Sequence, residues 1–129
     1  MVRPRLLLID DEPALAAYVA NAAGFSGFSA HVATGYIEFT EEFLANRPNM
    51  VALDLGMPGM DGVELLRFLA DQEYRSPVLI ISGFDRRVLE SAFRLGQALG
   101  LDMVGPLEKP VRLEELEALL NALRPTLVL

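Results

Sequence analysis

The chain has 129 residues, a net charge of −7 and a sequence pI near 4.6, which is enough for one ordinary domain and too few for two. Hydrophobic residues make up 52% of the chain, which argues against disorder, and the acidic balance argues against direct nucleic-acid binding. No apolar run approaches the roughly 20 residues of a membrane-spanning helix. The basic and then apolar N-terminus superficially resembles a signal peptide, but acidic residues end the apolar run too early. With no cysteine, the chain is expected to be a cytoplasmic protein without disulfides.

Short apolar runs alternate with amphipathic stretches along the chain, a pattern that predicts a parallel β-sheet flanked by helices. The expected strands are residues 5–9, 28–33, 50–54, 78–82 and 103–107. The expected helices are residues 13–23, 36–46, 62–71, 86–99 and 112–123. The sequence therefore predicts one α/β domain, a doubly wound (βα)5 fold with a five-stranded parallel sheet, whose core covers residues 4–124 and whose tail covers residues 125–129.

The composition of the strands predicts their places in the sheet. The first, third and fourth are continuously apolar, as strands buried on both faces are. The second strand, which contains His31, is expected at a sheet edge. Pro106 should place the fifth strand at an edge too, because proline cannot donate to the hydrogen-bond ladder.

Chemically reactive side chains follow four of the predicted strands. Asp10 and Asp11 follow the first strand, Asp54 ends the third, Ser82 ends the fourth and Lys109 follows the fifth. The carboxyl ends of parallel strands lie at one edge of the sheet, where such folds bind their ligands. We therefore expect three carboxylates, a hydroxyl and an ammonium group to converge there.

The chemistry of this group points to phosphoryl transfer. Carboxylates held close together repel one another, and a hard divalent cation with oxygen ligands, Mg²⁺ above all, relieves that repulsion. A carboxylate nucleophile beside a hydroxyl donor and an ammonium group suits the formation of an aspartyl phosphate. Lys109 is the only lysine among eleven lysines and arginines, and its compact ammonium suits a point contact with phosphate.

Three segments resemble the signatures of response-regulator receiver domains. They are Ile-Asp-Asp-Glu-Pro at 9–13, Leu-Asp-Leu-Gly-Met-Pro-Gly-Met-Asp-Gly at 53–62, and Lys-Pro at 109–110. Each piece alone is weak, but their combination in this order and spacing covers essentially the whole chain. The resemblance implies a flavodoxin-like, CheY-like fold and a phosphoacceptor function.

The resemblance also implies which residues would hold the metal and the phosphoryl group. Asp54 would be the phosphoacceptor, and Asp10 and Asp11 would form the acidic metal pocket. Mg²⁺ would be ligated by Asp11, Asp54 and the backbone carbonyl of Gly56. Gly56 and Phe84 would flank the path of an attacking water, so the phosphorylated state is expected to be long-lived.

Ser82 and Lys109 would bind the phosphoryl group, the latter held by a cis bond to Pro110. Receivers usually carry an aromatic residue three positions before this lysine, where the chain has Pro106, so the usual aromatic relay is in doubt. The implied partners are a histidine kinase or histidine phosphotransfer protein and a downstream protein or output domain. The domain is expected to be a signalling module and not an enzyme, and to be a monomer or a phosphorylation-linked dimer.

Other interpretations stay open at this point. Asp10 and Asp11 could be a solvated strand end, Glu12 reads as a first-turn helix charge, and Ser82 is followed by glycine, which is common turn chemistry. The whole chain could be an interaction module of the same fold that never uses phosphate. An aspartate-nucleophile phosphatase is a further alternative, although Gly56 stands where its second catalytic acid would lie.

Overall fold

The computed structural model describes residues 2–55, 62–83, 86–127 and 129. Within them the chain forms one parallel sheet in the order β2-β1-β3-β4-β5. Its strands are β1 (Arg5–Ile9), β2 (Ser29–Ala33), β3 (Met50–Asp54), β4 (Pro77–Ser82) and β5 (Asp102–Glu108). Every neighbouring pair is parallel, so the predicted five-stranded doubly wound fold is confirmed.

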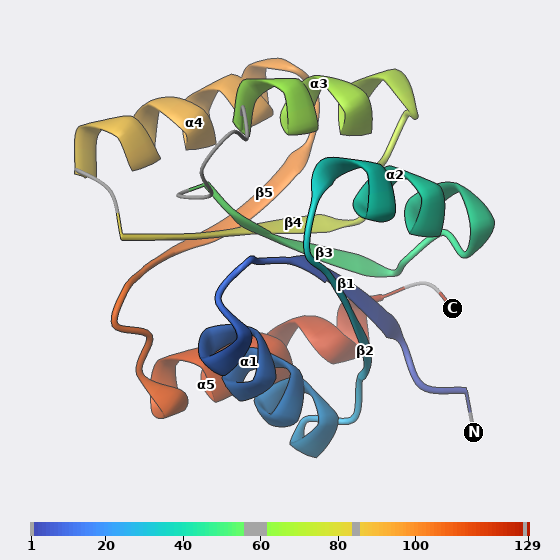
Figure 1. Cartoon of the computed structure of the whole chain (residues 1–129), viewed down its shortest axis with the longest axis vertical. Helices are drawn as coiled ribbons and strands as arrows, with labels where there is room; N and C mark the ends of the chain where they lie inside the picture. The colour runs from blue at the N-terminus through green and yellow to red at the C-terminus, as the bar shows by residue number, and fades with distance from the viewer. Residues whose placement is uncertain (1, 56–61, 84–85, 128) are drawn as a thin grey trace.

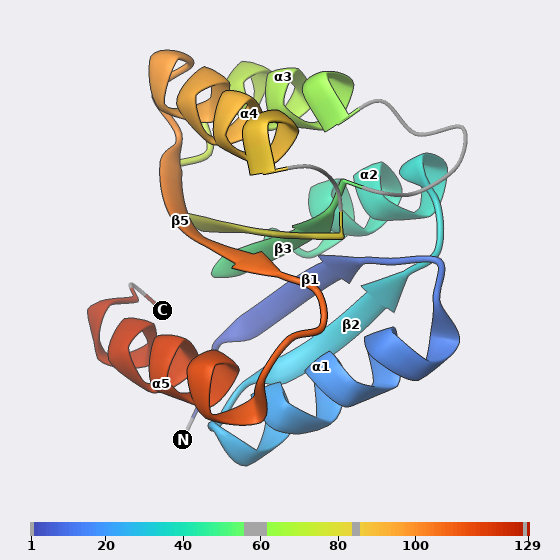
Figure 2. The same cartoon turned by 90° about the vertical axis from the view of Figure 1, so that its left-hand side faces the viewer.

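Helices cover both faces of this sheet. They are α1 (Pro13–Phe25), α2 (Tyr36–Ala45), α3 (Gly62–Asp71), α4 (Arg86–Ala98) and α5 (Leu113–Leu123), with a short 3-10 turn, η1 (Arg124–Thr126), at the end. Helices α1 and α5 lie on one side of the sheet and α2, α3 and α4 on the other (Figures 1 and 2). Among the helices of the described ranges, none has the length and apolar character needed to cross a membrane.

Alternation along the strands supplies two cores, one for each face. In β1, Leu7 and Ile9 belong to the core under α2, α3 and α4, whereas Leu6 and Leu8 belong to the core under α1 and α5. Successive side chains of a strand point to opposite faces, so a strand in the middle of the sheet must be apolar throughout. This requirement explains the uninterrupted apolar runs of β1, β3 and β4.

The two edge strands differ from the central ones in the way the sequence predicts. Strand β2 is half-exposed, and His31 lies on its exposed side. Strand β5 carries Pro106 at the opposite edge. There the ladder to β4 is irregular between Leu79 and Ile81, beside Gly105, whose φ of 86° few side chains could adopt.

The aromatic residues contribute packing mass. Phe39 and Phe43 are fully buried, and Phe68 and Phe93 pack against the same core. The rings of Phe43 and Phe68 meet edge to face with centroids 5.3 Å apart, a favourable aromatic geometry. These residues therefore belong to the core that holds α2, α3 and α4 against the sheet.

Candidate functional site

Three buried polar side chains lie at the carboxyl edge of the sheet. Asp10 directly follows β1, Asp54 ends β3 and Ser82 ends β4. Their exposed fractions are 2%, 1% and 0%. Because β1, β3 and β4 are adjacent and the chain order reverses between β1 and β3, this is the switch point where doubly wound folds bind ligands.

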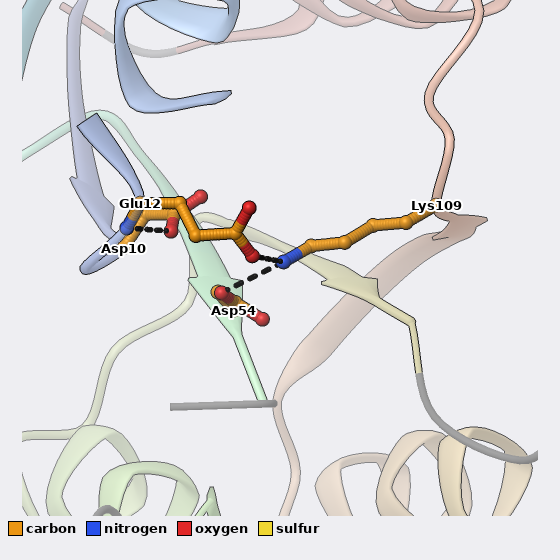
Figure 3. Close-up of polar contacts among 4 residues, drawn as sticks. All are labelled: Asp10, Glu12, Asp54 and Lys109. Carbon is orange, nitrogen blue, oxygen red and sulfur yellow. Dashed lines mark hydrogen bonds and ion pairs between the residues drawn. The ribbon is translucent and has the colours of Figure 1, made fainter. Parts of the chain in front are cut away.

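Lys109 reaches this edge from the end of β5. Its Nζ lies 3.0 Å from Asp54 Oδ2 and 2.8 Å from Glu12 Oε1, as Figure 3 shows. Its backbone N–H donates to the carbonyl of Ser82 at 3.0 Å, which ties the lysine to the end of β4. The Lys109–Pro110 bond is cis, as the sequence predicts.

Asp10 and Glu12 form the acidic side of the site. The Glu12 backbone N–H donates to Asp10 Oδ1 at 2.9 Å, and the Asp10 N–H donates to the carbonyl of Ala33 at 3.1 Å. Glu12 is the N-cap residue of α1. Carboxylate oxygens of Asp10, Glu12 and Asp54 all lie within 4.8 Å of one another.

The electrostatics follow from this crowding. Burial raises the pKa of Asp10 to about 6, with a further contribution from the charge of Asp54, although the hydrogen bond from the Glu12 N–H acts in the opposite direction. Burial lowers the pKa of Lys109, but its hydrogen bonds to Glu12 and Asp54 outweigh that effect, so the net shift is upward. Lys109 is therefore a firmly charged ammonium group between two carboxylates.

The structure thus brings together Asp10, Asp54, Ser82 and Lys109, four of the residues that the sequence singles out. Asp11 is exposed and is not a member of the carboxylate cluster.

The sequence also assigned roles to Gly56, Phe84 and Glu12. Gly56 and Phe84 lie outside the residues that the structure describes. The interpretation of Glu12 as a simple helix charge was incomplete, because its carboxylate contacts Lys109. The only feature of the sequence that points to this role is that Glu12 is the third consecutive acid after the first strand.

The cluster suits a hard divalent cation. Its ligand atoms would be carboxylate oxygens, two of them from buried side chains, and their spacing lets one small ion contact several. The Lys109 ammonium group pairs with the carboxylates of both Asp54 and Glu12. The residues present therefore fit Mg²⁺.

A family model described as the response regulator receiver domain matches residues 6–121. The chain belongs to this family. As a receiver domain it is a signalling module of two-component systems, and its acidic cluster is consistent with a phosphoacceptor site.

Similar proteins agree with this membership. The chain is 34% identical over 119 residues to the response regulator MprA of Mycobacterium sp. (strain KMS), covering 92% of this chain and 50% of that protein. It is also 34% identical to the transcriptional regulatory protein TrcR of Mycobacterium tuberculosis, covering 92% of this chain and 44% of that protein. The receiver domain thus spans about half the length of the curated relatives it matches.

Solved structures show the same fold. A response regulator from Colwellia psychrerythraea superimposes with a TM-score of 0.81 at 27% identity, covering 97% of this chain and 99% of that chain. The receiver domain of the Francisella response regulator 1452 gives a TM-score of 0.76 at 27% identity, covering 95% and 98%.

Proposed function

We propose that this receiver domain accepts a phosphoryl group on Asp54 from the phosphohistidine of a histidine kinase or histidine phosphotransfer protein, with Mg²⁺ bound. The observation that carries the proposal is the buried Asp54 carboxylate, which lies 3.0 Å from the ammonium group of Lys109 at the carboxyl edge of the sheet.

The chemistry needs few parts. The Asp54 carboxylate attacks the phosphorus atom, the new O–P bond forms as the N–P bond breaks, and the donor imidazole leaves with a proton. Lys109 and the hydroxyl of Ser82 would stabilise the charge on the transferred group. Fixed charges at a water-poor site are effective at this because they need little rearrangement.

Asp54 is better placed than Asp10 to be the acceptor. Asp10 uses Oδ1 to accept the Glu12 N–H, and its raised pKa leaves it partly protonated in mildly acidic solution. Asp54 belongs to the same cluster and contacts the ammonium group directly. Asp10 therefore supports the site, and Asp54 carries the modification.

Mg²⁺ would be held by acidic side chains of the β1–α1 loop together with Asp54. Asp10 and Asp54 already lie within reach of one ion, while Asp11 and the carbonyl of Gly56 are the ligands that the family resemblance adds. When bound, the metal supplies positive charge for the phosphoryl oxygens.

Phosphorylation would be read out through the elements that carry Ser82 and Lys109. The Arg86 Nε–Glu108 Oε1 ion pair of 3.5 Å links the start of α4 to the end of β5, and a groove lined by both residues and by Pro106 lies beside them. With proline in place of the usual aromatic residue, we propose that movement of α4 relative to β5 presents the switched surface to a downstream protein or output domain.

Intact mass spectrometry tests the acceptor assignment. Wild-type protein incubated with acetyl phosphate and Mg²⁺ should gain one phosphoryl group, and Asp54→Asn should gain none. Asp102→Asn is the matched control, because it removes an exposed carboxylate at the start of β5, at the end of that strand away from Lys109, and should still allow modification. An adduct that persists in Asp54→Asn would overturn the assignment, and absence of any adduct in the wild type would favour an interaction module that does not use phosphate.

A further inference from the structure

Glu12 contacts the ammonium group of Lys109, which would bind an oxygen of a phosphoryl group on Asp54. Its Oε1 lies 2.8 Å from Lys109 Nζ, slightly closer than Asp54 Oδ2 at 3.0 Å. The two carboxylates approach the ammonium group together, with the Glu12 side chain extending from the start of α1 (Figure 3).

A phosphoryl group on Asp54 would compete with Glu12. It would convert the Asp54 carboxylate into an acyl phosphate whose negative oxygens lie next to the ammonium group that Glu12 already contacts. Like charges in a partly buried site repel, and the carboxylates of Asp10, Glu12 and Asp54 are already within 4.8 Å of one another. Close contact of both Glu12 and the phosphoryl group with Lys109 therefore carries an electrostatic cost.

The structure allows Glu12 to leave without disturbing the fold. Its side chain is 61% exposed, whereas that of Lys109 is 19% exposed and that of Asp54 is 2% exposed. Its backbone is held separately, by the N–H bond to Asp10 Oδ1. Rotation of the Glu12 side chain into solvent would thus break one contact and leave the α1 N-terminus in place.

We propose that Glu12 is a positioning residue that occupies the phosphoryl-binding end of Lys109 in the unphosphorylated state and is displaced when Asp54 is phosphorylated. The contact holds the lysine over Asp54 before transfer and biases the domain toward the unmodified state. This inference rests on the proposed function, because it requires a phosphoryl group on Asp54.

Binding of beryllofluoride, a phosphoryl mimic, measures the competition directly. Calorimetric titrations would be run with Mg²⁺ at a concentration that saturates each variant, as established by separate Mg²⁺ titrations. Because the contact is partly solvent-screened, Glu12→Gln should bind beryllofluoride about two- to fivefold more tightly than wild type. Glu38→Gln, which removes the same charge from α2, should bind like wild type.

Two further variants separate a contact with Lys109 from a general effect of charge. Glu12→Asp keeps the charge but shortens the side chain by one methylene, so it should lose the contact and bind more tightly, like Glu12→Gln. In a Lys109→Gln background, Glu12→Gln should change the affinity by less than in the wild-type background, because the residue acts through the lysine.

The outcomes are distinct. Tighter binding in Glu12→Gln that disappears in the Lys109→Gln background supports the inference. Equal affinities of wild type and Glu12→Gln, or an equal gain in both backgrounds, would overturn it while leaving Asp54 as the acceptor. A wild-type protein that binds no beryllofluoride would overturn both the inference and the proposed function.

Discussion

Asp10 illustrates how one residue can oppose stability in order to build a site. It is buried at the end of β1 beside Asp54, and burial raises its pKa to about 6 from an ordinary value of 3.8. In metal-free protein the Asp10 carboxyl therefore keeps its proton in the folded state at pH values where the unfolded chain has released it. The contribution of Asp10 to the free energy of unfolding is therefore most favourable below about pH 4. It falls as the pH rises to about 6.

Asp10→Asn should remove this pH dependence. Asparagine keeps an oxygen to accept the Glu12 N–H but cannot ionise, so in EDTA the variant should be more stable than wild type at pH 7. The difference in the free energy of unfolding between the two proteins should grow from about pH 4 to about pH 6 and stay constant above pH 7. Urea unfolding at a series of pH values measures it, and a difference that is independent of pH would contradict the assigned shift.

At the scale of the elements, α4 and β5 approach closely because of one glycine. Gly96 of α4 is buried, and a Cβ built there would lie 2.8 Å from both Cγ and Cε of Met103 in β5 and closer still to Sδ. Gly24, in the last turn of α1, would meet no atom within 4 Å. The two glycines are both helical, but only one of them is required by packing.

The same substitution should therefore have opposite effects at the two positions. Gly24→Ala should stabilise the protein by about 0.5–1 kcal/mol, since alanine loses less backbone entropy in a helix. Gly96→Ala should destabilise it by about 1–3 kcal/mol, because the buried Met103 side chain must move. Urea midpoints at equal m-values test this pair, and a stabilising Gly96→Ala would show that Met103 repacks easily.

At the scale of the whole molecule, Mg²⁺ should stabilise the fold. In the cluster, Asp10 and Glu12 lie between β1 and α1 and Asp54 ends β3, so the cluster exists only when the sheet is assembled. A ligand that binds the folded state alone adds about 2.7 kcal/mol at one hundred times its dissociation constant. The stabilisation should be lost in Asp54→Ala.

Asp11→Ala tests a predicted metal ligand that stands apart from this cluster. The family resemblance makes Asp11 a metal ligand, which requires its exposed carboxylate to turn toward Asp54. We expect Asp11→Ala to weaken the Mg²⁺-dependent rise in the thermal midpoint, with Glu114→Ala as a control for loss of an exposed charge. Equal stabilisation in Asp11→Ala and wild type would leave Asp10 and Asp54 as the metal-binding carboxylates.

The sequence by itself predicted the fold closely because its local signals agree with one another. Apolar runs alternating with amphipathic stretches led to strand and helix bounds that differ from the observed ones by at most two residues, and Pro106 placed the last strand at an edge. The α1 helix runs to Phe25 and ends before Gly27, whose φ of 90° suits glycine. Convergence of Asp10, Asp54, Ser82 and Lys109 followed from the parallel sheet alone.

Only the tertiary structure decided how the charges pair. The sequence placed three consecutive acids after β1 but gave no sign that Glu12, and not Asp11, lies near Asp54 and Lys109. It also gave no sign that Gly96 makes room for Met103. Strand and helix patterns report which face of an element is buried, whereas side-chain pairing depends on distances between elements far apart in the chain, set by how the helices pack on the sheet.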